Sequence, residues 1–186
     1  MMKLQKLIDA IKKEAELKEI YIIAIDGMAA SGKTTLGCYL QKELEANLIH
    51  MDDFFLPTEL RNQKRLSTPG GNIHYERFYQ EIISSLKKNI HYHPFDCHTM
   101  QYKQEKILPF KKIVIIEGVY ALHPFFKKYY DYAIFLKVSN TTQYERLKVR
   151  NQNKLEQFVT QWIPLENQYF ETFQIESLCN KVIMNE

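Results

Sequence analysis

The sequence predicts an α/β fold in which helices cover both faces of a parallel sheet. Apolar runs alternate with segments of helical periodicity, the runs are almost continuously apolar, and a glycine-rich loop joins the first run to the first helix. Continuous apolar runs are typical of strands that are buried on both faces. The expected strands are Ile20–Ile25, Leu48–Met51, Ile113–Ile116, Tyr132–Val138 and Val182–Met184.

Segments of helical periodicity lie between and after these strands. The helix from Thr141 has a start signal, because Asn140 or Thr141 can cap it. Before the first strand, Met1–Lys18 carries its apolar residues on one face, which indicates an amphipathic helix rather than a secretory signal. The other expected helices are Lys33–Ala46, Tyr75–Lys88, Thr141–Arg150 and roughly Leu155–Phe173, whose aromatic residues are expected to pack in the core.

Two segments carry little periodicity. Leu56–Asn72 contains two prolines and two glycines and is predicted to be a long loop, of the kind that is usually functional or mobile. Within residues 90–112, the string His91–Phe95 could form a short edge strand.

Length and composition limit the classes of protein. We expect one domain over residues 1–186, and the 45% hydrophobic and 25% charged residues are ordinary globular values. A net charge of +3 is too small to argue for nucleic acid, and no apolar run reaches membrane-spanning length. Cys38, Cys97 and Cys179 lie far apart without C-x-x-C spacing, so we expect a reduced, cytoplasmic setting. The oligomeric state is not readable from the sequence.

Residues 27–34 match the phosphate-binding pattern G-x-x-x-x-G-K-[ST], between an expected strand and an expected helix. Backbone N–H groups of such a loop surround a phosphate, and the positive end of the helix dipole points to the same place. Lys33 would add a mobile charge for the β- and γ-phosphates, and the Thr34 hydroxyl would bind Mg²⁺. An ordinary glycine-rich turn is the alternative. The sequence thus predicts that ATP and Mg²⁺ bind at Gly27, Ala29, Ala30, Ser31, Gly32, Lys33, Thr34 and Thr35.

Acidic residues follow two of the expected strands. Asp52 and Asp53 come directly after Leu48–Met51, and Glu117 follows Ile113–Ile116. Ligands of such sheets sit at the carboxyl ends of the strands, so these carboxylates should open onto the nucleotide crevice. We expect Asp52 to accept the proton of an attacking hydroxyl, and Thr34, Glu117 and Asp52 to form the metal set. The Asp pair could instead cap a turn, Asp53 could bind Mg²⁺ through water, and Glu117 could be a solvated strand-end acid.

Basic and thiol groups suggest two further sites. Arg146 and Arg150 are four residues apart and share a helical face, which could lie over the donor phosphates as a lid at residues 141–156 and neutralise developing charge. A solvated surface helix is the alternative. His91, His93 and His98 surround Cys97, but the spacing is not that of a standard zinc site, so polar pocket lining or plain surface is favoured.

Several of these strings together resemble the uridine kinase family of P-loop kinases. The resemblance runs from about residue 20 to the C-terminus. It rests on Asp26-Gly27 through Thr35, Met51-Asp52-Asp53-Phe54-Phe55, Pro94-Phe95-Asp96, Ile116-Glu117-Gly118 and Arg146-Leu147-x-x-Arg150.

The resemblance implies a P-loop NTPase three-layer sandwich with a five-stranded parallel sheet and a helical lid. It also implies transfer of the ATP γ-phosphate to a nucleoside 5′-hydroxyl, with Asp52 in the base position and Phe55 in the place of an aromatic residue near the acceptor. The catalytic set is then Asp52, Lys33, Arg146 and Arg150. The acceptor set is Asp53, Phe55, His74, Arg77, Phe95 and His98.

The sequence departs from the family pattern in three places. The Phe-Asp-His-Pro element, whose aspartate holds ribose hydroxyls, is replaced by Asn72-Ile73-His74-Tyr75, and isoleucine cannot accept those hydrogen bonds. Met100 stands where a pocket histidine is usual, with His98 nearby, and the lid turn is shortened to Asn151–Lys154. The sequence therefore resembles the bacterial uridine kinase-like group more than it resembles true uridine–cytidine kinases. The expected acceptor is a nucleoside or a similar hydroxyl-bearing metabolite.

Other nucleotide-binding classes fit the sequence less well. A GTP switch would need Asn-Lys-x-Asp after a strand, whereas Asn153-Lys154-Leu155-Glu156 lies in the expected lid and ends in Glu. A mechanical ATPase would need a longer chain with a second subdomain. A binder without turnover would not need Lys33, Thr34, Asp52 and Glu117 all intact.

Overall fold

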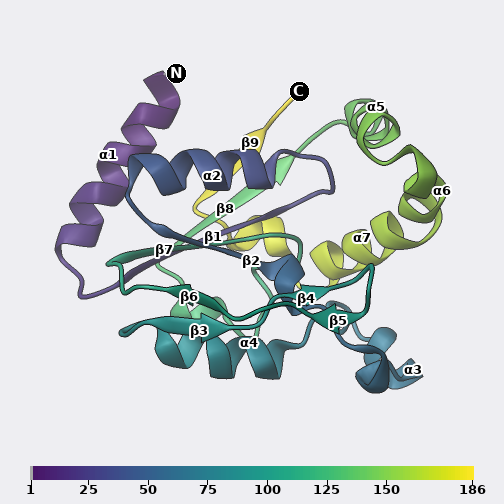
Figure 1. The fold of residues 1–186 in the computed structure, drawn as a ribbon. Helices are drawn as coiled ribbons and strands as arrows, with labels where there is room; N and C mark the ends of the chain where they lie inside the picture. The colour runs from purple at the N-terminus through teal and green to yellow at the C-terminus, as the bar shows by residue number, and fades with distance from the viewer. Residues whose placement is uncertain (1) are drawn as a thin grey trace.

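The computed structural model describes residues 2–186, and within this range five strands form one wholly parallel sheet. Their order across the sheet is β2-β7-β1-β8-β9 (Figure 1). The expected strands are confirmed, with ends that move by one or two residues. The bounds are β1 (Tyr21–Gly27), β2 (Asn47–His50), β7 (Ile113–Glu117), β8 (Tyr132–Lys137) and β9 (Lys181–Met184).

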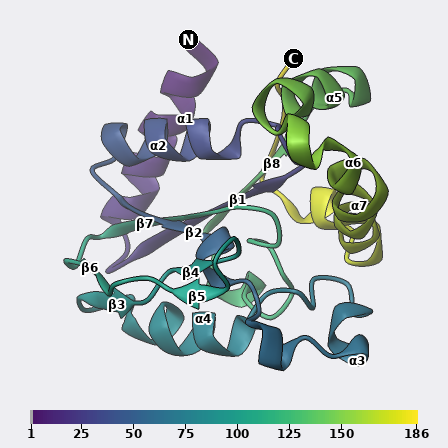
Figure 2. The same cartoon turned by 45° about the vertical axis from the view of Figure 1, so that its right-hand side comes forward.

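Helices cover both faces of this sheet and give the expected three-layer sandwich. In Figure 1, α1 (Met2–Glu16) and α2 (Lys33–Glu43) lie above the sheet, and α4 (Tyr75–Glu81) lies below it. The chain after β8 forms α5 (Asn140–Arg150), α6 (Leu155–Gln157) and α7 (Ile163–Thr172). These three helices stand together beside the sheet in both Figure 1 and Figure 2.

The core divides into two apolar clusters, one on each face of the sheet. In β1, Ile23 and Ile25 belong to the cluster that contains Ile8 of α1, whereas Ile22 and Ala24 belong to the opposite cluster, which contains rings from the α4 layer. Successive side chains of a strand point to opposite faces, so a strand covered on both sides must be apolar at every position. This is why the strands are continuous apolar runs in the sequence.

The string His91–Phe95, where a short edge strand is expected, contains strand residues, but they belong to two small antiparallel sheets and not to the main sheet. Pro94 divides the string between two small antiparallel sheets. One pairs β3 (Ile90–Tyr92) with β6 (Lys106–Leu108), and the other pairs β4 (Phe95–Asp96) with β5 (Gln101–Tyr102). The long loop before α4 also contains a short helix, α3 (Gln63–Leu66).

Two details of the C-terminal helices differ from the sequence-based prediction. The cap of α5 is Ser139, one residue earlier than expected, and its hydroxyl accepts the Thr142 N–H at 3.3 Å. The expected single helix after residue 155 is divided by a π-helical turn at Phe158–Trp162, where the Ile163 N–H bonds to the Phe158 carbonyl five residues back. Pro164 follows this turn and lacks an N–H, which disfavours ordinary α-helical bonding there.

In the part of the chain that the structure describes, no helix combines the length and the apolar character needed to cross a bilayer.

We expect the core below the sheet to depend on Phe126, which is fully buried and packs on Phe78 with ring centroids 4.6 Å apart. Phe126→Ala should lower the free energy of unfolding by about 3–5 kcal/mol, because it removes a buried ring and leaves a cavity. Phe125→Ala is the matched control, since its ring is 47% exposed, and should cost about 1 kcal/mol or less. Urea unfolding of both variants measures the difference. Equal losses would contradict the assignment of Phe126 to the core.

Candidate active site

The phosphate loop leaves β1 through residues whose backbone needs positive φ. Gly27 has φ +140°, and a Cβ there would lie 2.1 Å from the Leu136 carbonyl oxygen, so only glycine fits. Ala30 (φ +57°) and Gly32 (φ +95°) complete the turn into α2. Thr34 and Thr35, in the first turn of α2, are exposed to solvent. The loop therefore ends on an open helix N-terminus, as an anion site requires.

Lys33 folds back onto the loop. Its Nζ donates to the carbonyls of Gly27 at 2.8 Å and Met28 at 2.9 Å, and its side chain is buried. The ammonium thus lies inside the turn that the motif predicts to surround a phosphate.

The Glu117 carboxylate meets two side chains at the end of β7. The Thr34 hydroxyl donates to Glu117 Oε1 at 3.1 Å, and His50 Nδ1 lies 2.5 Å from the same oxygen. Glu117 is buried, and its hydrogen bond raises the pKa of His50. Two of the predicted metal residues, Thr34 and Glu117, are therefore in contact.

Asp52 lies beside this pair. It lies in the 3₁₀ turn Met51–Phe54 that follows β2, and its Oδ1 is 3.5 Å from the position that a Cβ on Gly118 would occupy. Asp52 is accessible from the crevice, but the surrounding protein removes enough water to raise the pKa of its carboxyl; Lys33 opposes this rise and Glu117 adds to it. The acidic groups of two strand ends thus lie together at the start of α2, Glu117 against Thr34 and Asp52 near Lys33.

For the histidines around Cys97, polar pocket lining or plain surface is the favoured interpretation over a zinc site. Within residues 2–186, no three His, Cys, Asp or Glu side chains lie close enough together to hold a metal ion, and this includes His91, His93 and His98.

Asp26 is a buried carboxylate that the sequence analysis gave no role of its own. Its Oδ1 accepts the Gly27 N–H at 2.7 Å, and its Oδ2 accepts the Leu122 N–H and the Tyr169 hydroxyl, each at 2.9 Å. Burial raises the pKa of Asp26 to about 6. This side chain joins the start of the phosphate loop to the segment after β7 and to α7. The sequence feature that could have indicated a role for Asp26 is its position as an acidic residue at the end of an apolar strand.

Side chains of the C-terminal third hold the outer side of the phosphate loop. Glu166 Oε2 of α7 accepts the Ala29 N–H at 2.9 Å, and Gln143 Nε2 of α5 donates to the Ala29 carbonyl at 3.0 Å. Arg146 donates to the Ala30 carbonyl at 3.2 Å. Glu166 and Gln143 were not among the expected site residues, because nothing in the local sequence pairs them with the loop.

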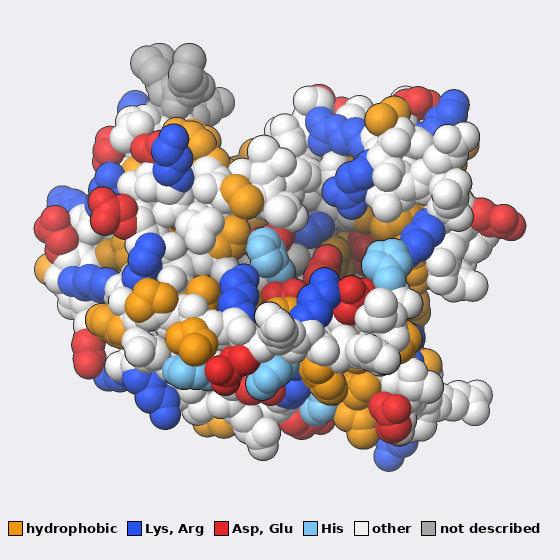
Figure 3. Space-filling model, in the orientation of Figure 1, with side chains coloured by type: hydrophobic (Ala, Val, Ile, Leu, Met, Phe, Trp, Pro, Cys, Tyr) orange, Lys and Arg blue, Asp and Glu red, His pale blue; other side chains and the backbone are white. Residues whose placement is uncertain are grey.

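The two arginines of the expected lid behave differently. Arg146 contacts the loop, whereas Arg150 is exposed and donates to its neighbour Asn151 at 2.9 Å. Beyond them, Lys154 Nζ lies 3.1 Å from His98 Nδ1, so the lid turn touches the β4–β5 hairpin. Figure 3 shows the hollow on this face, with acidic and basic side chains in it and histidine at its rim.

Most of the expected acceptor residues are held by contacts within the fold. His98 contacts the lid turn, but the Arg77 guanidinium is buried, donating to the backbone carbonyls of His93 (2.6 Å) and Asp53. His74 accepts the Arg77 N–H at the start of α4. The other three are also engaged within the fold: Asp53 accepts the Tyr92 hydroxyl, Phe55 bridges Ile73, and Phe95 is buried against Tyr102.

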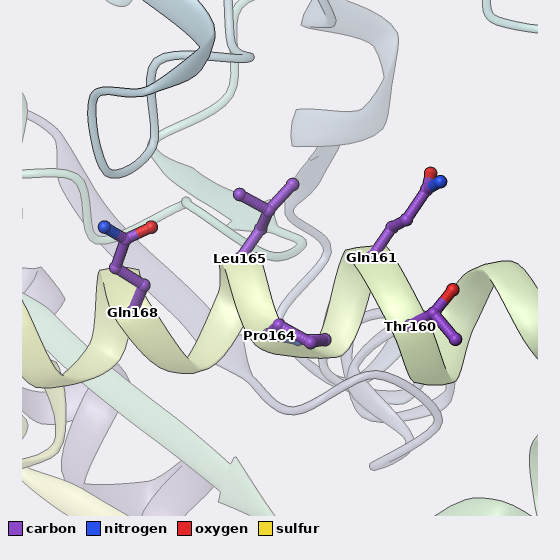
Figure 4. A pocket seen from close by; sticks show the side chains of 5 residues that line it. All are labelled: Thr160, Gln161, Pro164, Leu165 and Gln168. Atoms are coloured by element: carbon purple, nitrogen blue, oxygen red, sulfur yellow. The ribbon is translucent and has the colours of Figure 1, made fainter.

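Two surface hollows lie outside the phosphate loop. One is lined by Thr160, Gln161, Pro164, Leu165 and Gln168, all from the π-helical turn and α7 (Figure 4). The other is lined by Ser85, Lys88, Asn89 and His91. Neither is lined by a residue of the phosphate loop.

Comparison with known protein families identifies the family to which the chain belongs. Residues 23–174 match the family model of the AAA domain, AAA_18. The chain belongs to this AAA domain family. The matched range includes the phosphate loop, both acidic strand ends and the helices that contact the loop. Among curated protein sequences, none matches the chain significantly.

Solved structures of low sequence identity share the fold of this AAA domain. A possible uridine kinase from Bacillus stearothermophilus is 18% identical, with a TM-score of 0.68 over 97% of this chain and 99% of that one. YFH7 from Saccharomyces cerevisiae, described as a candidate P-loop kinase with a circular permutation, is 14% identical, with a TM-score of 0.62 over 98% and 99%. A candidate fructose transport system kinase from Silicibacter sp. TM1040 is 20% identical, with a TM-score of 0.59 over 89% and 90%. The expected P-loop fold is therefore confirmed.

We expect the buried Asp26 to make stability depend on pH. Its carboxyl holds a proton more tightly in the folded protein, where its pKa is about 6, than in the unfolded chain, where it is near 3.8. The unfolding free energy relative to Asp26→Asn should therefore fall by about 2–3 kcal/mol as pH rises from about 4 to 7, at about 1.4 kcal/mol per unit. Urea unfolding of both proteins across this range measures the change. Parallel curves would show that Asp26 does not titrate differently in the two states.

Proposed function

We propose that this chain is an ATP-dependent small-molecule kinase, similar to uridine kinase, that transfers the γ-phosphate of ATP to a hydroxyl of a nucleoside or similar metabolite. One observation carries the proposal: Asp52 stands beside the Thr34–Glu117 contact and close to Lys33, at the open end of the phosphate loop. A donor site alone would need no free carboxylate at that place. A kinase needs one to orient the attacking hydroxyl.

The phosphate loop supplies the donor half of the reaction. Its backbone N–H groups and the start of α2 would bind the ATP phosphates, and Lys33 would exchange its two carbonyl partners for phosphate oxygens. Arg146, which bonds to the Ala30 carbonyl, is near enough to the loop to meet developing charge on the transferred group. For Arg150, the last residue of α5, the proposal requires the side chain to leave Asn151 and turn inward.

The oxygen groups beside the loop fit Mg²⁺. This ion prefers hard oxygen ligands and usually combines one or two carboxylates with waters and substrate phosphates. The Thr34 hydroxyl and the Glu117 carboxylate, 3.1 Å apart, with Asp52 adjacent, form such a set. When bound, the ion would neutralise charge on the β- and γ-phosphate oxygens.

Asp52 is the proposed base. Its raised pKa makes it a stronger proton acceptor than an ordinary surface aspartate, and its accessible side faces the crevice that an acceptor would enter. Transfer of the hydroxyl proton to Asp52 would accompany attack of the oxygen on the γ-phosphorus, with ADP leaving on the opposite side.

The acceptor belongs to the class of small hydroxyl-bearing metabolites, with uridine as the first candidate to assay. We further propose that the chain works as one kinase domain in the cytoplasm, with ATP and the acceptor as its partners. A panel of nucleosides and alcohol metabolites, each incubated with Mg-ATP while ADP release is followed, tests the reaction class. ADP release that no acceptor accelerates would contradict the proposal, as would a strong preference for GTP.

We expect Asp52→Asn to reduce phosphoryl transfer by about a hundredfold or more, because general base catalysis contributes about 10²–10⁴. Asp53→Asn is the matched control: the neighbouring carboxylate already accepts the Tyr92 hydroxyl, so its loss should change the rate far less. ATP affinity, measured by calorimetry, should stay within about threefold for both variants. The reverse pattern, with Asp53→Asn inactive and Asp52→Asn active, would show that the base is Asp53.

A further inference from the structure

Glu166 is a carboxylate in an unusual position, buried between α7 and the phosphate loop. The residue is 7% exposed, and its Oε2 accepts the Ala29 N–H at 2.9 Å. Burying a carboxylate in a protein is costly, and a packed apolar side chain of similar size is often equally or more stable. Packing alone therefore does not explain an acid at this place.

The peptide unit that Glu166 contacts is held on both sides. The Ala29 N–H bonds to Glu166 of α7, and the Ala29 carbonyl accepts Gln143 Nε2 of α5, whose side chain is also buried. The two partners come from helices more than a hundred residues along the chain. The next residue, Ala30, has φ +57°, a conformation that costs a non-glycine residue about 1 kcal/mol or more. External bonds are what hold this backbone in its turn.

We infer that Glu166 is a positioning residue for nucleotide binding. By engaging the Ala29 N–H on the outer side of the loop, it fixes the turn through Ala30, so that the N–H groups at the start of α2, from Gly32 onward, remain available to the phosphates of a nucleotide. The inference rests on the proposed function in one respect only, that the loop binds a nucleotide. It is independent of the acceptor and of the base.

The charges around Glu166 are consistent with this role. Lys33 of α2 favours its ionised form, while Asp26 of β1 and Asp52 disfavour it, and burial raises the pKa of Glu166 to about 7. Both the carboxylate and the carboxylic acid can accept the Ala29 N–H. A glutamine side chain can also accept it through its amide oxygen, which makes Glu166→Gln the conservative variant.

The experiment is calorimetric titration of the full chain with Mg-ADP, which requires no acceptor. We expect Glu166→Ala to weaken ADP binding about tenfold, because the hydrogen bond that orders the loop is lost. Glu166→Gln should restore affinity to within about threefold of the unchanged protein. The matched control is Asn167→Ala, an exposed neighbour on α7, which should leave affinity unchanged. Thermal unfolding of each variant establishes that it is folded.

The outcomes separate this inference from the proposed function. If the unchanged protein binds Mg-ADP and Glu166→Ala binds it equally well, the positioning role is wrong while the kinase proposal stands. If Glu166→Gln is as weak as Glu166→Ala, the role is also wrong, since the acceptor atom is kept. If the unchanged protein does not bind Mg-ADP, both proposals fall. Should Glu166→Ala not fold, Gln143→Ala, which frees the other side of the same peptide, must weaken binding in the same direction.

Discussion

The backbone of the phosphate loop is held from its outer side, and the arrangement of the rest of the molecule follows from that constraint. A loop that turns its N–H groups inward needs partners for the polar groups that face outward. One partner is adjacent in the chain, Asp26 near the end of β1. The others come from three distant places: Gln143 and Arg146 on α5, Glu166 on α7, and Asn185 after β9, which donates to the Ser31 carbonyl at 2.8 Å. The N-terminal and C-terminal thirds of the chain therefore meet at one loop.

This constraint limits which part of the expected lid can move. The sequence suggested a lid at residues 141–156, yet α5 is bonded to the loop through Gln143 and Arg146, and α7 is bonded to it through Glu166. A motion of these helices as one body would break those bonds. The turn between them has a single polar contact across the crevice, from Lys154 to His98. Under the kinase function proposed above, closure over the substrates would therefore fall to that turn, with α5 and α7 as its fixed supports.

The sequence predicted those elements whose residues are dictated by their immediate surroundings in the chain. Strands buried on both faces must be apolar throughout, and the phosphate loop needs glycine at fixed places, so β1, β7 and the turn at Gly27 could be read directly. The contacts that sequence reasoning missed are long-range. Nothing near Glu166 indicates that its partner is Ala29, 137 positions away. Such contacts depend on how distant helices pack against the loop, which the local sequence does not determine.

The position of Ile73 bears on the acceptor. By resemblance to the uridine kinase family, Ile73 stands where an aspartate would hold ribose hydroxyls. In the structure Ile73 is fully buried, pairs with Phe55 through a short β-bridge, and belongs to the core below the sheet. Restoring a carboxylate there would place a charge among apolar side chains rather than in the crevice. Under the kinase function proposed above, recognition of the acceptor would therefore fall to groups from other elements, with Asp52 and His98, which contacts the lid turn, as the candidates.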